Sequence, residues 1–160
     1  MKITLIILLL VAIFGIPGSH YKIRTSLPPY RAKIAIPVFV NRSFKENLGD
    51  ILTGEVIDQF MLRTRFQIVP EDEADFILRG KVLNYTKQLT SVEFSEAGEY
   101  RIEVEVEASL YKRKNKLWRK TITESKVYYS SSQNEQKAIE DVCQKIGEDL
   151  VNLTIKGWKK

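Results

Sequence analysis

The chain has 160 residues, of which 44% are hydrophobic and 28% are charged, and its formal net charge is +5. Because this positive charge is modest and acidic residues are mixed with basic ones, the composition argues against a nucleic-acid-binding protein. The only cysteine is Cys143, so an intramolecular disulfide is excluded and the fold must be held together by packing.

Residues 1–18 have the pattern of a secretory signal peptide. Lys2 supplies a positive charge, residues 3–16 are almost all apolar, and a break containing the small residue Gly18 follows. The apolar run is shorter than the roughly 20 residues of an ordinary membrane-spanning helix, which makes a retained anchor the less favoured alternative. We therefore predict an exported protein that is cleaved after Gly18, or one residue later, and begins near Ser19.

The rest of the chain is predicted to comprise an N-terminal lead-in, residues 19–32, and one domain, residues 33–160. This length is typical of a single domain that can bury a core. The first predicted strand spans residues 33–40. Pro37 within it cannot donate a ladder hydrogen bond, which indicates an edge position, a bulge or an irregular stretch.

A capping box marks the predicted start of the first helix. Ser43 is followed three residues later by Glu46, and apolar residues then recur at helical spacing to about Arg63. A short strand at residues 66–69 and an acidic connector at residues 71–75 come next. The connector offers carboxylate oxygens but lacks the spacing and the glycine of a calcium-binding loop, so we interpret it as a solvated turn.

Three long strands with short connections predict an antiparallel meander. The first runs from residue 76 to about residue 92, with Gly80 at a bulge or a close approach, and a turn at residues 95–98 follows. The second, residues 100–111, alternates strictly between apolar and polar side chains, which indicates one buried and one solvated face. A polar hairpin tip leads to the third strand, residues 117–129.

A second capping box, from Ser132 to Glu135, predicts a terminal helix that ends at Gly157. The element order is therefore β-α-β-β-β-α, and each helix has one apolar stripe. We predict an α+β fold, a two-layer sandwich in which two helices pack on one face of a mostly antiparallel, mixed sheet of four to five strands.

The other face of this sheet is predicted to be partly open and charged. It carries Glu103, Glu105 and Glu107, beside basic residues of the neighbouring strands: Arg79, Lys81, Arg119 and Lys120. Paired carboxylates can perform acid–base catalysis, but a solvated face with basic partners across the strands explains this row better.

The sequence contains no recognisable catalytic or metal-binding set. Cys143 lies on the apolar stripe of the last helix, which indicates a buried structural cysteine. The only histidine, His20, lies at the start of the mature chain, where it cannot complete a nucleophile–base pair or a zinc site. We predict a non-enzymatic protein without catalytic residues, metal or cofactor, and a small hydrolase is the least favoured alternative.

The strongest positive cluster is the hairpin tip between the second and third long strands. It contains Lys112, Arg113, Lys114 and Lys116. Charges at such a tip often serve solubility alone. In the alternative interpretation, exposed basic side chains on a rigid tip bind phosphate groups of an anionic lipid, or a negatively charged lumen.

Several segments resemble one known family. They are His20-Tyr21, Ser26-Leu27-Pro28-Pro29, the stretch KIAIPVFVNRSF at residues 33–44, and FQIVPEDEADFILRGKVLNY at residues 66–85. Together with the elements that follow, they resemble the LptE-type lipopolysaccharide-assembly lipoproteins of the bacterial outer membrane. The resemblance implies a two-layer α/β fold and a non-enzymatic protein that partners and plugs the β-barrel LptD and helps to deliver lipopolysaccharide to the cell surface.

The resemblance also implies a location on the periplasmic side of the outer membrane, with an LptD-like barrel and lipopolysaccharide as partners. No family motif identifies the lipid contacts, so we assign them to the basic hairpin tip. Family members carry a lipobox cysteine at the cleavage site, but here Ser19 stands at that position, and a hydroxyl cannot form the thioether of a lipid anchor. The stretch IAIPVFVNRS is also similar to the first unit of TolB- or CsgG-like envelope proteins, so a periplasmic adaptor or secretion-scaffold domain is the alternative function.

Overall fold

The computed structural model describes residues 32–91, 98–129 and 135–157. The predicted signal peptide (1–18), nearly all of the lead-in, residues 95–97 of the predicted turn, and Ser132 of the second capping box lie outside these residues and stay predictions. Neither helix in the described part of the chain has an apolar stretch long enough to cross a membrane.

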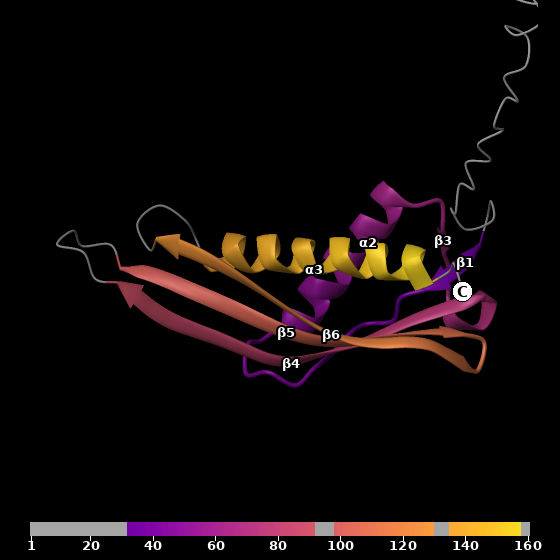
Figure 1. Cartoon of the computed structure of the whole chain (residues 1–160), viewed down its shortest axis with the longest axis horizontal. Helices are drawn as coiled ribbons and strands as arrows, with labels where there is room; N and C mark the ends of the chain where they lie inside the picture. Colours follow the sequence, from indigo (N-terminus) through magenta and orange to yellow (C-terminus); the bar gives the residue numbers. More distant parts are fainter. Residues whose placement is uncertain (1–31, 92–97, 130–134, 158–160) are drawn as a thin grey trace, which may run out of the picture.

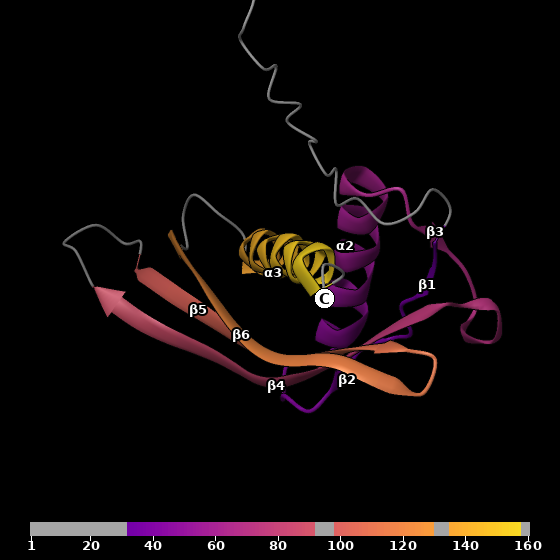
Figure 2. The same cartoon turned by 45° about the vertical axis from the view of Figure 1, so that its right-hand side comes forward.

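One mixed sheet of six strands forms the first layer, and two helices cover one of its faces (Figure 1, Figure 2). The predicted two-layer α+β fold is therefore confirmed, with more strands than the four to five expected. The strands are β1 (Lys33–Ala35), β2 (Val40–Asn41), β3 (Gln67–Ile68), β4 (Phe76–Ser91), β5 (Glu99–Lys112) and β6 (Asn115–Tyr129). The helices are α2 (Leu48–Arg63) and α3 (Glu135–Gly157), and a 3₁₀ turn at Glu71–Glu73 precedes β4.

The strands β4, β5 and β6 form the predicted antiparallel meander, and the sheet order is β3-β1-β4-β5-β6, with β2 also pairing with β4. The alternation predicted for residues 100–111 is confirmed. The buried apolar side chains of β5 face the helices and are Ile102, Val104, Val106, Ala108 and Leu110. The residues between them lie on the opposite face, which no described element covers; we call this the open face.

The predicted first strand is interrupted at Pro37. β1 pairs in parallel with β4 beside Phe76, the chain then leaves the sheet, and β2 returns to pair with β4 beside Lys81. Pro37 lies in the segment between the two strands, where no ladder hydrogen bond is required from it. The irregular stretch expected from this proline is therefore confirmed.

Phe39 explains the glycine in β4. Its side chain is only 1% exposed, and its ring lies against Gly80 so closely that a β-carbon at residue 80 would overlap the ring. Gly80 is therefore a point of close approach. The pairing of β4 with β5 is irregular further along the strand, between Val82 and Asn84 and again between Leu89 and Ser91.

The first helix begins later than its capping box predicted. α2 starts at Leu48, its N-cap residue Asn47 has a left-handed backbone with a φ of 57°, and no side chain caps it. The Ser43 hydroxyl instead donates to the Asn41 side-chain oxygen at 2.8 Å and accepts the Lys45 N–H at 3.3 Å. The Asn41 amide also donates to the Lys45 carbonyl at 2.7 Å. The predicted start was wrong because this local polar turn competes successfully with the first helical turn.

The hydrophobic core lies between the helices and the sheet. Its largest fully buried contributions from the helices are Leu48, Leu52 and Phe60 of α2 with Ile139, Ile146 and Leu150 of α3. The predicted burial of Cys143 is confirmed, because its side chain is 0% exposed within this core. Burial also raises the pKa of the Cys143 thiol to about 12, so little nucleophilic thiolate forms near neutral pH.

Candidate functional site

The four basic residues of the predicted tip lie together at one end of the sheet. Lys112 ends β5, Arg113 and Lys114 form the turn, and Lys116 lies at the start of β6. All four side chains are exposed, and we call them the basic tip. Arg113 adopts a left-handed backbone with a φ of 55°, as tight two-residue hairpin turns require.

Asp75 ties the basic tip to the start of the described domain. Its carbonyl oxygen accepts the Arg113 N–H at 3.3 Å, and its carboxylate accepts the Lys33 N–H at 3.1 Å. The Asp75 N–H in turn donates to the Lys33 carbonyl at 3.1 Å. The β5–β6 turn, β1 and the C-terminal end of α3 therefore gather at the same end of the molecule (Figure 1).

Two cations of the basic tip rest on aromatic rings. Lys112 Nζ lies 5.6 Å from the ring centroid of Phe76, and Lys116 Nζ lies 5.7 Å from that of Tyr111. Exposed contacts of this kind contribute about 0.5–1 kcal/mol each. The Arg79 guanidinium also approaches the Tyr111 ring, at 6.0 Å, so Tyr111 connects the basic tip with the open face.

On the open face, Glu107 is held between two basic side chains, as the sequence predicted. Its Oε1 lies 3.0 Å from Lys81 Nζ, and its Oε2 lies 3.7 Å from Arg119 Nε. The hydrogen bond from Lys81 is the main reason that the pKa of Glu107 is lowered. A carboxylate that stays ionised in this way is poorly suited to act as a general acid.

The strand register corrects the expectation for Lys120. If β5 and β6 paired in one continuous register from the tight turn, Lys120 would lie opposite Glu107. The register instead shifts by one residue between Leu110 and Tyr111. Lys120 therefore lies opposite Ala108, whose side chain is buried beneath the helices, so Lys120 lies on the helix side of the sheet. A one-residue shift is sufficient because successive side chains of a strand point to opposite faces.

Glu103 and Glu105 also differ from the expectation. They lie on the open face, but their neighbours on β4 and β6 are hydroxyl and amide residues rather than bases. These neighbours are Thr86 and Ser125 for Glu103, and Asn84 and Thr123 for Glu105. Glu107 is thus the member of the predicted row that has basic partners across the strands.

The open face is hollowed beside Glu107. The hollow has a volume of about 190 Å³ and is lined by side chains from β2, β4, β5 and β6. Its charged and aromatic lining consists of Arg79, Lys81, Glu107, Tyr111 and Arg119. Three positive groups and one negative group give it an excess of positive charge, which suits an anion. In the described ranges, no group of three or more His, Cys, Asp or Glu side chains is placed to hold a metal ion.

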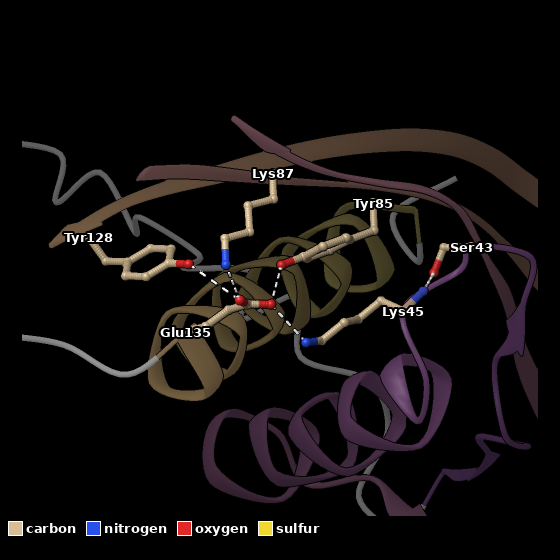
Figure 3. Close-up of polar contacts among 6 residues, drawn as sticks. All are labelled: Ser43, Lys45, Tyr85, Lys87, Tyr128 and Glu135. Carbon is tan, nitrogen blue, oxygen red and sulfur yellow. Dashed lines mark hydrogen bonds and ion pairs between the residues drawn. The ribbon is translucent and has the colours of Figure 1, made fainter. Parts of the chain in front are cut away.

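A second polar cluster surrounds Glu135, the first residue of α3 (Figure 3). Its Oε1 accepts hydrogen bonds from Lys45 Nζ at 2.7 Å and from the Tyr85 hydroxyl at 2.8 Å. Its Oε2 accepts hydrogen bonds from Lys87 Nζ at 2.5 Å and from the Tyr128 hydroxyl at 3.4 Å. One carboxylate thereby joins α3 to β4, to β6 and to the turn that precedes α2.

The electrostatics of the Glu135 cluster indicate a structural role. Hydrogen bonds from Lys45 and Lys87 lower the pKa of Glu135 to about 2, and the bond to Glu135 raises the pKa of Lys87 to about 12. Burial raises the pKa of Tyr85. Sequence analysis recognised Glu135 as a helix-start residue but missed the cluster, because Lys45 and Lys87 precede it by 90 and 48 residues.

The fold is similar to several solved structures. A minor lipoprotein from Acinetobacter baumannii is 17% identical, with 78% of this chain and 92% of that chain covered and a TM-score of 0.51. A hypothetical protein from Chlamydia trachomatis is 10% identical, with 80% and 98% covered and a TM-score of 0.60. A protein from Xanthomonas campestris is 13% identical, with 85% and 91% covered and a TM-score of 0.53. Identities this low show a shared fold alone.

The comparison with curated proteins found no match. The comparison with protein families found one: LptE, described as lipopolysaccharide-assembly, matches residues 31–154. The match includes all six strands, α2 and most of α3. It spans the two longer stretches that carried the resemblance, residues 33–44 and 66–85, whereas the short segments at residues 20–21 and 26–29 precede it. Since well over half of the chain is matched, this protein belongs to the LptE family, and its general role is lipopolysaccharide assembly at the outer membrane.

Proposed function

We propose that this protein partners an outer-membrane β-barrel of the LptD type, acts as its plug, and helps to deliver lipopolysaccharide to the cell surface. Membership of the LptE family supports the general role. The structural observation that carries a binding mechanism is the set of four exposed cations on the tight β5–β6 turn. In this proposal the protein acts by binding and not by catalysis.

The basic tip offers a defined set of donors for lipid phosphates. Lysine and arginine side chains donate charge-assisted hydrogen bonds to phosphate oxygens, and these are stronger than neutral hydrogen bonds. The turn is held by the bond from the Arg113 N–H to the Asp75 carbonyl, so little backbone freedom is lost when a ligand binds. We therefore assign the contact with the phosphate groups of lipopolysaccharide to this tip.

We place the protein on the periplasmic side of the outer membrane after export. Because Ser19 stands where a lipobox cysteine would be acylated, we propose that association with the barrel replaces a lipid anchor. Intact-mass measurement of the mature protein tests this point. An unmodified chain that begins near Ser19 would support it, and a mass increased by acyl chains would contradict it.

Co-purification from detergent-solubilised outer membranes tests the partnership. We expect the protein to be recovered in a complex with a large β-barrel protein. Recovery only as a free monomer would contradict the proposal. Recovery as a soluble ring, or with a soluble periplasmic partner, would instead favour the TolB- or CsgG-like adaptor or secretion scaffold.

Neutralising the basic tip tests the lipid contact. We expect the combined replacement of Lys112, Arg113, Lys114 and Lys116 by Gln to weaken lipopolysaccharide binding by about tenfold or more, because charge-assisted bonds are lost. Co-purification with the barrel should persist. The control removes the same charge elsewhere, through Gln at four other exposed positions: Arg42, Arg65, Arg101 and Lys120. Equal losses in both variants would indicate a general charge effect and contradict a site at the tip.

A further inference from the structure

We propose that the hollow on the open face is a second anion site, which binds a phosphate group. It is formed by different residues from the basic tip, and the proposal does not depend on delivery of lipopolysaccharide. The recognised chemistry is the phosphate group itself, which free phosphate and a phosphorylated lipid both carry. The experiment below separates these two sources.

The hollow lies beside the interruption of the first strand. β1 ends at Ala35 and β2 begins at Val40, so neither strand lies beside the edge of β4 around Arg79 and Gly80. The space of about 190 Å³ is several times the roughly 30 Å³ that one molecule occupies in liquid water. It therefore accommodates a polyatomic anion together with part of its hydration shell.

The cations of the hollow remain accessible to a ligand. The side chains of Arg79 and Arg119 are 57% and 53% exposed, and that of Lys81 is 38% exposed. A guanidinium presents several N–H donors in a planar fork that matches the oxygens of a phosphate group. The two arginines come from β4 and β6, on either side of β5, so a ligand in the hollow is approached from two sides.

The present partners of the two arginines hold them weakly. Arg119 reaches Glu107 only through Nε, at 3.7 Å, and the ion pair of Arg79 with Glu71, at 2.7 Å, lies at an exposed position. Exposed ion pairs contribute little net stability, so a doubly charged phosphate can take over these donors at small cost. The Ser109 hydroxyl, 3.4 Å from Arg119 Nε, adds a further hydrogen-bonding group to the lining.

Tyr111 lines the hollow on the side nearest the basic tip. Its ring is approached by Arg79 at 6.0 Å and by Lys116 at 5.7 Å, so it holds one cation of the hollow and one of the tip. Val40, which is 56% exposed, adds an apolar side chain to the lining. The ring and Val40 together provide apolar contact for whatever group carries the phosphate.

Glu107 distinguishes a binding site from an ion-pair network that only stabilises the sheet. In a binding site, Glu107 competes with the ligand for Lys81 and Arg119, so its removal should strengthen phosphate binding. In a purely stabilising network, replacing Glu107 should change phosphate binding no more than replacing Glu103. Glu103 lies on the same face of the same strand and carries the same charge.

Titration of the purified full-length chain with inorganic phosphate at constant ionic strength tests the site. We expect Arg119→Gln to weaken binding about tenfold, the loss typical of a charge-assisted hydrogen bond. Lys120→Gln is the matched control, because it removes the same charge from the next residue on the other face. Glu107→Gln should bind more tightly than the native chain, and Glu103→Gln should not. Equal effects within either pair, with inorganic phosphate and also with the lipid probe described next, would overturn the proposal.

A second arm repeats the titrations with lipopolysaccharide in detergent micelles, with the basic tip intact. The expected ranking is weaker binding by Arg119→Gln than by Lys120→Gln, and tighter binding by Glu107→Gln than by Glu103→Gln. If this ranking holds with both probes, free phosphate is sufficient. If it holds only in micelles, the phosphate must be carried by a lipid. Either result supports the site, and the absence of this ranking with both probes overturns it. Thermal melting of each variant confirms folding, and failure here leaves the assignment of the basic tip standing.

Discussion

Gly80 lies against the aromatic ring of Phe39, so closely that a β-carbon at residue 80 would overlap the ring atoms. Phe39 is only 1% exposed and belongs to the segment that leaves the sheet between β1 and β2. The contact therefore holds the segment between β1 and β2 against the core. The interruption of the first strand leaves the edge of β4 open beside the hollow.

Replacing Gly80 by Ala should destabilise the protein by about 1–3 kcal/mol, because the ring or the strand must shift to admit a methyl group. The free energy of unfolding from chemical denaturation measures the effect. Gly54→Ala is the control: nothing lies within 4 Å of its β-carbon, so the alanine should stabilise α2 by about 0.5–1 kcal/mol. A Gly80→Ala protein as stable as the native one would contradict the close approach.

Removing the Glu135 carboxylate should change how stability depends on pH. The folded-state pKa of about 2 lies below the ordinary value of 4.5, so the unfolded state binds this proton more readily. The stabilisation is therefore fully present above about pH 4.5 and is lost as the pH falls toward about 2. Because the side chain is 24% exposed, we expect Glu135→Gln to cost about 1–2 kcal/mol at neutral pH, less than the full electrostatic value.

Denaturation from about pH 7 down to about pH 3 measures this dependence, and Glu135→Gln should flatten it. Tyr85→Phe is the companion variant, since it removes one hydroxyl donor but keeps both lysine ion pairs. It should lower stability by about 0.5–1.5 kcal/mol and largely preserve the acid dependence. If Glu135→Gln kept the native slope, the assigned pKa shift would be wrong.

Cys143 should be inert toward alkylating reagents while the protein is folded. Its side chain is 0% exposed, and burial raises the pKa of its thiol to about 12, so access and thiolate formation are both suppressed. Labelling with iodoacetamide at increasing urea, followed by mass spectrometry, should therefore track global unfolding. Rapid labelling of the native protein would show that α3 opens locally.

Arg113→Gly should separate the stability of the basic tip from its binding. A left-handed backbone is costly for arginine but not for glycine, so the variant should retain or gain stability, by up to about 1 kcal/mol. Its lipopolysaccharide binding should weaken because a cation is lost. Lys114→Gly, at a position without positive φ, removes the same charge and should lose about 0.5–1 kcal/mol. Thermal melting compares the two, and the opposite order of stability would refute the assigned turn.

Local sequence patterns were sufficient where a structural feature depends on neighbouring residues. The alternation over residues 100–111 predicted which side of β5 is buried, because the two faces of a strand follow a period of two. Pro37 predicted the irregular first strand, since it has no N–H to donate. The charges between two predicted strands also placed the basic tip on a hairpin turn.

Tertiary structure decided the features that depend on register or on distant partners. The capping box at Ser43 failed because Asn41 engages the same turn. The register shift beside Tyr111 turned Lys120 away from the open face. Glu135 meets Lys87 across 48 residues of chain only because the sheet and α3 bring them together. The sequence by itself therefore determined the fold class, the exposed tip and most of the elements. Only the packed sheet decided which charges share the hollow, because a one-residue change in register reverses the face of every side chain.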